Sequence, residues 1–305
     1  SVSDATVYDE SDANFTLQSP APTGNYSLSF DGSDDYANIV ELSTAIDNSS
    51  ITLMGWFKST SNGEPNIYYE GVFGFRNYPS SNGNYFAAMN WTGYSEPTIA
   101  CYGGADASFP LTPNDDEWYH LALVYDNTNA VFSTYLDGIQ MASNTAANDP
   151  IVPSIDLLIG NNIENGNHFF QGYIDDVSLW SVALSQENIQ SYLSSELNGN
   201  ETGLVGYWNF NEGTGTTAYD ATSNGNDGTI NGATWSTDVP SEINPAINVT
   251  SPNGGETWEL GSTNEITWTS SYISGNVKIE LYQNGSAYQI IEGNTENNGS
   301  YSWTI

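Results

Sequence analysis

Positive charge is almost missing from this 305-residue chain, which has three Lys and Arg residues against 37 Asp and Glu residues and a formal net charge of −34. Only Lys58, Arg76 and Lys278 could pair with a buried carboxylate. A surface this acidic repels nucleic acid and anionic membranes, so we expect neither nucleic-acid binding nor membrane insertion. The charge favours a neutral polysaccharide, or an acidic one that is bridged by a divalent cation.

Cysteine and long apolar runs are also missing. Cys101 is the single cysteine, which excludes an internal disulfide and a thiolate metal site. No apolar run is long enough to span a membrane. Few Lys residues beside many Asn, Thr, Ser, Gly, Tyr and Trp residues are typical of secreted β-rich bacterial proteins, so we expect a secreted or cell-surface, extracellular protein.

What is present is a series of short β-type runs separated by turns rich in Gly, Asn and Asp, the pattern of an all-β sandwich. The pair Asp137-Gly138 predicts a tight hairpin. One helix is expected at 184–197, with Ser185 as its N-cap and a role in covering the edge of the sandwich. The clearest expected strands are 26–30, 37–40, 51–59, 71–75, 119–126, 131–138 and 156–160.

The residue pattern of the sequence changes near its C-terminal end. Residues 237–246 contain prolines and no periodicity, which predicts a linker. Residues 247–305 alternate strongly and predict a small Ig-like sandwich. Because this segment stops inside an expected strand, we expect a truncated module and neighbouring domains in a longer polypeptide. Its core candidates are Trp268, Ile279, Leu281 and Trp303.

Six sequence pieces occur in the order found in one family. They are "LSFDGSDDYANI" (28–39), "ITLMGWFKST" (51–60), "DEWYHLALVYD" (116–126), "YLDGIQMAS" (135–143), "LLIGNN" (157–162) and "GYIDDVSLWSVALSQENI" (172–189). They resemble the LamG-like family, the laminin-G or concanavalin-A-like jelly-roll sandwich. The resemblance implies two packed antiparallel sheets, one convex and one concave, in a domain of residues 1–236. The later "SPNGGE" resembles Ig-like spacer modules of secreted bacterial proteins.

Residues 203–235 resemble a segment that often precedes "FDG" in this family but follows it here. We therefore expect a permuted arrangement, in which this segment adds strands to the same sandwich. Val205, Tyr207, Trp208 and Phe210 need a core to bury them, and the segment is too short to form one. A separate hairpin or the stub of a second repeat is the alternative.

Two adjacent carboxylates interrupt the apolar run at 169–180. Strict alternation along a strand would place Asp175 and Asp176 on opposite faces, and a buried carboxylate needs a cation. The family resemblance implies that Asp175 is a calcium ligand together with the "FDG" loop. A solvated pair of aspartates is the alternative. The expected calcium ligands are Asp31, Asp34, Asp35 and Asp175.

A second acidic stretch, at 219–228, contains Asp220 and Asp227. It lacks the Glu that an EF-hand loop requires. We therefore interpret it as an Asn-Gly turn with solvated acids.

Motifs for catalysis are scarce. A glycosidase of this sandwich type needs carboxylates that alternate along one concave strand, and no run supplies them. His120 and His168 are the only histidines; we interpret His120 as structural. The sequence contains no serine elbow and no phosphate-binding glycine loop. We therefore expect no enzymatic activity.

An aromatic-rich stretch at 67–109 suggests the ligand surface. Phe73, Phe75 and Phe86 are assigned to the core by default. Aromatic rings beside Asn and Arg donors suit sugar rings. The expected ligand-binding residues are Arg76, Tyr78, Asn90, Trp91, Tyr94, Tyr102 and His168.

These features favour a monomeric, non-catalytic carbohydrate-binding module that binds a polysaccharide or oligosaccharide and contains structural calcium. An adhesin that binds a protein or cell surface, a spacer, and an undetected hydrolase or lyase are the alternatives.

Overall fold

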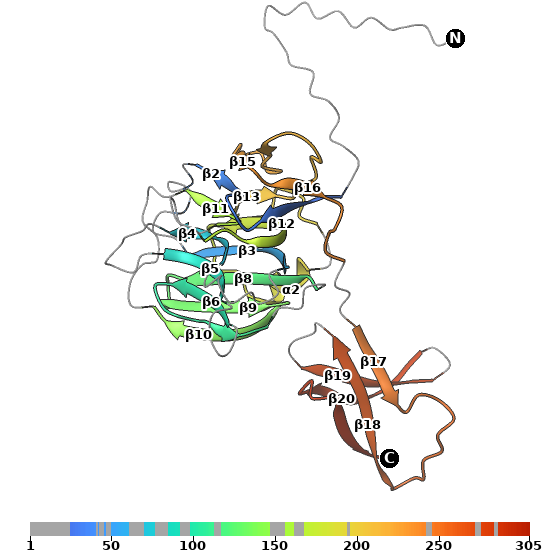
Figure 1. Ribbon diagram of the computed structural model, residues 1–305. Coiled ribbons are helices and arrows are strands. Elements are labelled where there is room, and N and C mark those ends of the chain that lie inside the picture. Colours follow the sequence, from blue (N-terminus) through green and yellow to red (C-terminus); the bar gives the residue numbers. More distant parts are fainter. Residues whose placement is uncertain are drawn as a thin grey trace, which may run out of the picture.

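The computed structural model describes most of the chain from residue 25 onward, and nearly all of its regular structure is β (Figure 1). Only the backbone is described for Arg76, Tyr85 and Trp91. The all-β prediction is confirmed. The described residues are 25–40, 42, 46, 50–60, 70–76, 85–91, 98–112, 117–146, 156–161, 168–193, 196–241, 246–271, 276–283 and 286–305.

The first layer, sheet A, has the strand order β10-β9-β8-β3-β12-β1-β16, and β13 also pairs with β12. All its pairings are antiparallel. Its strands are β1 (Ser27–Asp31), β3 (Ile51–Ser59), β8 (Tyr119–Asp126), β9 (Val131–Leu136), β10 (Ile139–Thr145), β12 (Gln171–Trp180), β13 (Leu204–Trp208) and β16 (Thr234–Ser236).

The second layer, sheet B, has the order β14-β15-β2-β11-β4-β5-β6-β7 and is also antiparallel. The two sheets confirm the predicted concanavalin-A-like jelly-roll sandwich. The strands are β2 (Tyr36–Ile39), β4 (Glu70–Arg76), β5 (Tyr85–Trp91), β6 (Thr98–Gly103), β7 (Phe109–Pro110), β11 (Leu157–Ile159), β14 (Thr217–Ala218) and β15 (Gly228–Asn231).

The main core lies between the two sheets. Alternate residues of each strand enter it, because neighbouring side chains in a strand point to opposite faces. Phe57 and Phe132 from sheet A meet Phe73 and Phe86 from sheet B, and all four are fully buried. The default assignment of the phenylalanines to the core is confirmed.

The hairpin between β9 and β10 turns at Asp137 and Gly138, whose φ angles of 48° and 74° are left-handed. These are the angles that a tight two-residue hairpin turn requires, and Asp and Gly adopt them at low cost. The hairpin prediction is confirmed.

Helix α2 (Gln186–Ser191) covers the outer face of sheet A, the face that points away from sheet B. Its N-cap is Ser185, whose hydroxyl accepts a hydrogen bond from the backbone of Asn188, as predicted. Ile189 is fully buried beside Trp180 and Tyr207 in a second apolar cluster. The helix therefore covers a sheet face, rather than only the sandwich edge as the sequence suggested.

The strands of residues 203–235 pair with strands of both layers. β13 pairs with β12, and β15 pairs with β2. β16 pairs with β1. Trp208 and Phe210 are fully buried in the main core.

Asp220 organises the turn that follows β13. It is only 8% exposed, and its carboxylate accepts hydrogen bonds from the backbone N–H groups of Tyr207, Thr222 and Asn226. The Thr222 hydroxyl donates a fourth bond. The interpretation of this turn as solvated acids is therefore wrong for Asp220, because the backbone donors replace its water shell.

The two adjacent aspartates of β12 lie at a β-bulge. Asp175 pairs with Trp56, whereas Ser178 pairs with Met54, so the strand carries one extra residue. Asp176 lies at φ 50°. A bulge places two successive residues opposite one residue of the partner strand. The prediction that the two aspartates lie on opposite faces is therefore wrong.

The C-terminal strands form a separate body (Figure 1). A three-stranded sheet has the order β17-β18-β21, and β19 pairs with β20. Ile266 and Trp268 are buried, while Ile279, Leu281 and Trp303 are partly buried. The Ig-like assignment stays a prediction. The strands are β17 (Ala246–Ser251), β18 (Thr263–Ser271), β19 (Val277–Gln283), β20 (Ser286–Thr295) and β21 (Ser300–Thr304).

Asp238 fastens the expected linker to the sandwich at its start. Its carboxylate forms a 2.8 Å ion pair with Lys58 and accepts a hydrogen bond from the Trp118 indole. Its backbone carbonyl accepts a bond from the Ser27 hydroxyl. The chain therefore leaves sheet A only after this contact.

Candidate functional site

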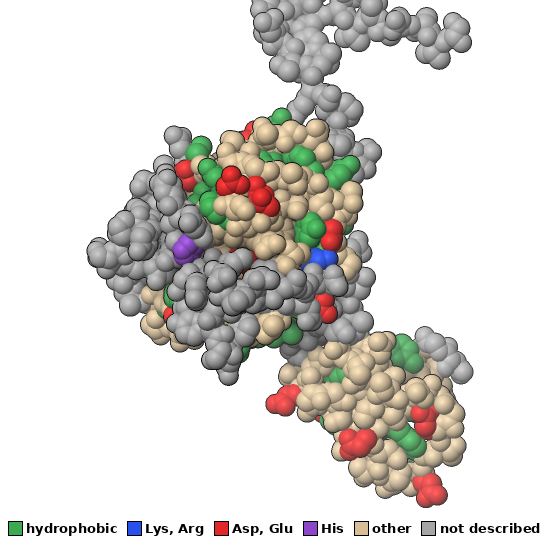
Figure 2. Space-filling model, viewed as in Figure 1, with side chains coloured by type: hydrophobic (Ala, Val, Ile, Leu, Met, Phe, Trp, Pro, Cys, Tyr) green, Lys and Arg blue, Asp and Glu red, His purple; other side chains and the backbone are tan. Residues whose placement is uncertain are grey.

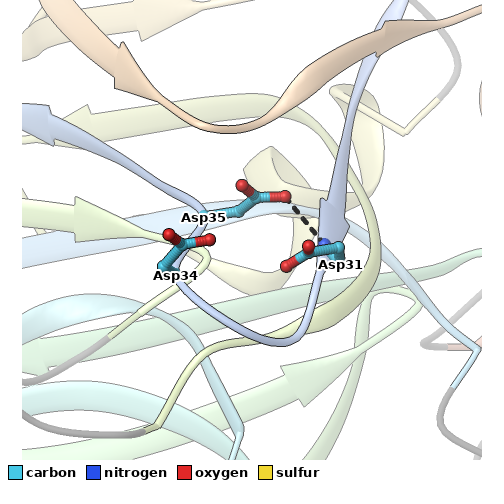
Figure 3. A group of neighbouring side chains, drawn as sticks. All are labelled: Asp31, Asp34 and Asp35. Carbon is cyan, nitrogen blue, oxygen red and sulfur yellow. Dashed lines mark hydrogen bonds between the residues drawn. The ribbon is translucent and has the colours of Figure 1, made fainter.

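Three aspartates converge in the turn between β1 and β2, and we name Asp31, Asp34 and Asp35 the acidic loop. One carboxylate oxygen from each lies within 4.8 Å of the others. Figure 3 shows the three side chains gathered over the turn, with the bond between Asp35 and the Asp31 backbone drawn as a dashed line. Asp31 and Asp34 are exposed, whereas Asp35 is 6% exposed.

The backbone of the acidic loop is held by its own side chains. Asp35 accepts a hydrogen bond from the Asp31 backbone N–H at 2.8 Å, and Asp31 accepts one from the Ser33 N–H at 2.8 Å. Gly32 has a φ of 81°, which most residues with a Cβ avoid. The turn is thus formed before any ligand binds.

Residues that follow β15 complete the cradle around Asp35. A Cβ atom added at Gly232 would lie 2.0 Å from Asp35 Oδ1, so only glycine fits there. The turn between β15 and β16 therefore supports the acidic loop from a distant part of the sequence.

The electrostatics of the acidic loop suit a cation. Burial raises the pKa of Asp35, and the charges of Asp31 and Asp34 raise it further, although the Asp31 backbone bond opposes them. In the space-filling view, basic side chains are nearly absent from the face shown (Figure 2). Hard oxygen ligands in a flexible loop are what Ca²⁺ prefers. A bound calcium ion would relieve the mutual repulsion of the three carboxylates.

Asp175 does not belong to the acidic loop. Asp31 pairs with Gln171, and Asp175 lies four residues farther along β12, roughly 13 Å at the usual strand rise. The charges that act on Asp175 are those of Asp176, Glu196 and Glu212. The expected four-aspartate site therefore reduces to three, and the carboxylate of Asp175 is accommodated in another way.

An aromatic pair adjoins the acidic loop. Tyr36 directly follows Asp35, and its ring centroid lies 6.5 Å from that of Phe169 at an interplanar angle of 34°. Both side chains are partly exposed. We had not selected either residue from the sequence, although "DDY" and "HFF" place both rings next to polar turns.

The expected sugar platform is only partly described. Tyr78 and Tyr94 lie outside the described residues, and of Arg76 and Trp91 only the backbone is described. Arg76 pairs with Tyr85 at one end of the β4–β5 ladder, whereas Asn90 lies at its other end. Six residues of strand separate the two ends, roughly 20 Å. Arg76 and Asn90 therefore do not form one binding surface, and that part of the prediction is wrong.

Asn90 is buried between the sheets at 1% exposure. Its amide donates hydrogen bonds to Glu70 on β4 and to Ser59 on β3. The amide nitrogen therefore bonds within the interior, and a side chain that is 1% exposed cannot contact a ligand at the surface. The assignment of Asn90 to the ligand surface is corrected for this reason.

Tyr102 and His168 are partly exposed in separate parts of the molecule. Tyr102 lies on β6 opposite Ala87. His168 precedes Phe169, and its backbone carbonyl accepts a hydrogen bond from Gly71. Of the predicted ligand residues that are described, His168 is the one adjacent in sequence to the aromatic pair.

His120 is buried and faces Trp56 at a ring distance of 5.2 Å. Burial lowers its pKa to about 3, so the imidazole is neutral at physiological pH. The backbone of His120 exchanges two 2.8 Å hydrogen bonds with Asp137 at the β9–β10 hairpin.

Comparisons with known proteins agree with the fold. A family model described as the concanavalin A-like lectin/glucanases superfamily matches residues 31–190. A candidate carbohydrate-binding protein from Bacteroides ovatus superimposes with a TM-score of 0.55 at 21% identity, over 74% of this chain and 63% of that chain. Jeltraxin of Lepidobatrachus laevis is 26% identical over 104 residues, which are 31% of this chain and 46% of jeltraxin. The chain thus spans less than two thirds of the length of either relative.

The described residues contain no helix that is both long and apolar enough to span a membrane.

Proposed function

The chain belongs to the concanavalin A-like lectin/glucanase superfamily, and from this premise we propose that it is a non-catalytic carbohydrate-binding module with a calcium site in the acidic loop. The observation that carries the proposal is the convergence of three carboxylates within 4.8 Å beside a partly exposed aromatic pair. The similarity to the Bacteroides ovatus protein supports a sugar as the ligand class.

Asp31, Asp34 and Asp35 would hold the calcium ion. Asp31 and Asp35 each use one carboxylate oxygen to accept a backbone N–H, which leaves their second oxygens for the metal. Asp34 adds a carboxylate from the exposed side of the turn. When bound, calcium would offer its remaining coordination positions to sugar hydroxyls, because it accepts six to eight oxygen ligands.

Tyr36 and Phe169 would supply the apolar part of the sugar site. Sugar rings present C–H faces that pack on aromatic rings, while their hydroxyls need polar partners. His168 lies next to Phe169 in the chain and would stand at the rim. This places the ligand beside the acidic loop rather than over β5.

The absence of catalysis is supported by the placement of the acids. A glycosidase holds two carboxylates about 5–10 Å apart across an accessible sugar site. The acidic loop groups its carboxylates in one exposed turn, and Asp175 is 1% exposed. Neither arrangement places an acid and a base on either side of a bound sugar.

We extend the proposal to the organisation of the chain. Residues 1–236 would form the lectin-like domain, 237–246 the linker and 247–305 an Ig-like module, in a secreted or cell-surface monomeric protein. The strand pairings of β13, β15 and β16 with β12, β2 and β1 support the inclusion of 203–235 in the first domain.

The test is calorimetric titration with calcium, followed by a glycan array with and without EGTA. We expect one calcium site and calcium-dependent glycan binding. Asp34→Asn should weaken both, because it removes an exposed carboxylate without disturbing the core. Glu187→Gln, which removes an equally exposed charge on α2, is the matched control. Unchanged calcium affinity in Asp34→Asn would overturn the calcium site. Glycan binding that is the same with and without EGTA would show that sugar binding does not depend on the metal.

A protein-binding role is the second candidate. Tyr282, Tyr288 and Ile290 are more than half exposed on β19 and β20. Exposed apolar groups of this size mark contact surfaces when they are contiguous. A glycan array without hits, together with cell-surface binding that is lost in a Tyr288→Ser variant, would favour the adhesin over the lectin.

A further inference from the structure

A pocket of about 120 Å³ lies under the segment that follows α2, on the outer face of sheet A. A water molecule occupies roughly 30 Å³ in the liquid, so the pocket has room for a small polar group. It lies on the far side of sheet A from the main core and is separate from the acidic loop. Its walls include Trp56, His120, Asp176, Tyr192, Glu196 and Tyr207.

The floor of the pocket is the β-bulge of β12. This bulge marks the point where the neighbour of β12 changes: β1 pairs with residues 171–174, and β13 pairs with 177–180. Asp175 and Asp176 lie between the two pairings. Gly55 lies opposite, where a Cβ would come within 2.9 Å of Val177.

Burial raises the pKa of both aspartates of the bulge. The pKa of Asp175 lies well above its usual value, because burial and then the charge of Asp176 both raise it. Burial raises the pKa of Asp176 to about 6, while the Tyr207 hydroxyl that donates to it acts in the opposite direction. Asp176 is therefore largely ionised at pH 7.

The pocket is lined by carboxylates and by one imidazole nitrogen that has no hydrogen-bond partner. His120 is 3% exposed, and its Nδ1 atom has no hydrogen-bond partner. With the proton of the neutral imidazole on Nε2, Nδ1 is an acceptor. Glu196, at the exposed rim, adds a second carboxylate. Among the described residues that line the pocket, none is a lysine or an arginine.

The basic side chains that the structure describes are occupied elsewhere. Lys58 pairs with Asp238, and Lys278 pairs with Glu280. Neither of the two described lysines therefore neutralises the charge of Asp176.

We propose that this pocket binds the primary ammonium group of an amino sugar. An ammonium group has three N–H donors and no acceptor, which matches the acceptors of Asp176, Glu196 and His120. Trp56 and Tyr192 also line the pocket, and aromatic rings are side chains with which cations interact favourably. The proposal concerns a second site and holds whether or not the acidic loop binds calcium.

The surroundings of the pocket favour an amino sugar over other cations. Among the described residues, the only acidic group whose ligand atoms lie within 4.8 Å is the acidic loop, so this pocket does not form a metal cage. Asn25 and Ser241 lie at the pocket with Glu196, and their polar side chains suit a hydroxylated carrier. Met54, Leu193, Leu197 and Pro240 also line the pocket, so a lysine side chain is the competing ligand that the experiment must include.

Calorimetric titration of the full chain with D-glucosamine, N-acetyl-D-glucosamine and Nα-acetyl-lysine methylamide tests the proposal. The two sugars have the same ring, but only D-glucosamine has a charged amine. We expect N-acetyl-D-glucosamine to bind at least about tenfold more weakly, because acetylation removes the charge-assisted hydrogen bonds. Equal affinity for the two sugars would overturn the proposal, and equal or tighter binding of the lysine derivative would overturn the amino-sugar assignment.

Two variants locate the site. Asp176→Asn and Glu196→Gln should each weaken glucosamine binding about tenfold, by the loss of a charged acceptor. Glu196 is exposed, so its variant should fold normally even where Asp176→Asn does not. Glu187→Gln is the control and should bind glucosamine as the wild type does, with EGTA present throughout. Full affinity in Glu196→Gln with normal melting would refute this site, while the calcium titration of the acidic loop would remain unaffected.

Discussion

The acidic loop follows β1, and the bulge aspartates lie on β12, the strand that pairs with β1, but the backbone gives their carboxylates different roles. In the acidic loop, a turn leaves Asp31 and Asp34 exposed and points three carboxylates at one space. In the bulge, Asp175 is 1% exposed and lies beside Asp176, and the two lysines that the structure describes are paired elsewhere. The first arrangement is suited to a metal ion, whereas in the second burial raises the pKa of both carboxyl groups.

Exposure explains the difference. Carboxylates near water stay ionised at small cost and can exchange water for calcium. A buried carboxylate loses its hydration, which favours its protonated form over an unpaired charge. The same residue type therefore predicts different ligands in the two places.

Removal of the chain after Asn200 should have the largest effect, because both acidic sites depend on it. The deletion removes β13, which lies beside the bulge, and Gly232, which supports Asp35. It also removes Tyr207, Trp208 and Phe210 from the two apolar clusters, each worth about 1.5–3 kcal/mol. We expect this shortened chain to be insoluble or unfolded by circular dichroism.

A shortened chain that ends at Ser241 retains these strands and serves as the control. Cooperative melting of the chain that ends at Asn200 would show that residues 203–235 are an independent appendage.

Acidification should change the contributions of His120 and Asp176 to the free energy of unfolding in opposite directions. The folded-state pKa of His120, about 3, lies below the usual 6.5, so its contribution to stability is present above pH 6.5 and falls as the pH decreases. Between pH 7 and pH 4 the loss is about 3 kcal/mol. The pKa of Asp176, about 6, is raised from 3.8, so its contribution is lost as the pH rises from 3.8 through 6.

Denaturant unfolding at pH 7 and pH 4 measures both effects. Relative to His120→Gln, the wild type should lose stability on acidification. Relative to Asp176→Asn, the wild type should gain it, by about 3 kcal/mol. Two variants that shift in the same direction would contradict the charge states assigned here.

Calcium should stabilise the sandwich through the acidic loop and leave the bulge unchanged. A ligand at one hundred times its Kd adds about 2.7 kcal/mol to the free energy of unfolding. We expect EGTA to lower the Tm of the wild type and of Glu196→Gln equally. Asp34→Asn should show little response to either reagent, and an identical EGTA shift in that variant would exclude the acidic loop as the site.

The smallest effect is expected for Tyr207→Phe, which removes the hydroxyl that donates to Asp176. A buried acceptor left without its donor costs about 1–3 kcal/mol. The stability lost relative to the wild type should be greater at pH 7 than at pH 5, because the Tyr207 hydroxyl lowers the pKa of Asp176 and stabilises its ionised form. Tyr135→Phe, whose hydroxyl bonds Gln140 at 3.4 Å near the surface, is the matched control.

Features set by local chemistry could be predicted from the sequence. Asp137-Gly138 specified the hairpin, Ser185 specified the helix start, and the β-branched and aromatic runs specified the strands. The acidic loop could also be predicted, because "FDGSDDY" places three carboxylates in one turn.

Features set by distant contacts could not be predicted in the same way. The bulge at Asp176 depends on the change of neighbour from β1 to β13, and strict alternation gave the wrong faces. Asn90 and Asp220 looked like surface residues because their types are polar. Glu70 and Ser59 satisfy Asn90 inside the sandwich, and backbone N–H groups satisfy Asp220.

The contacts of Asp238 with sheet A determine how the sandwich would respond to mechanical load. A pull on the C-terminal strands reaches sheet A first at Asp238, which is joined to Lys58 on β3 and to Ser27 on β1. The force therefore enters strands in the interior of the sheet before it can peel β16 from the edge. Hydrogen bonds loaded together in shear resist rupture better than bonds opened one after another, so a single ion pair would convert a weak point of attachment into a strong one.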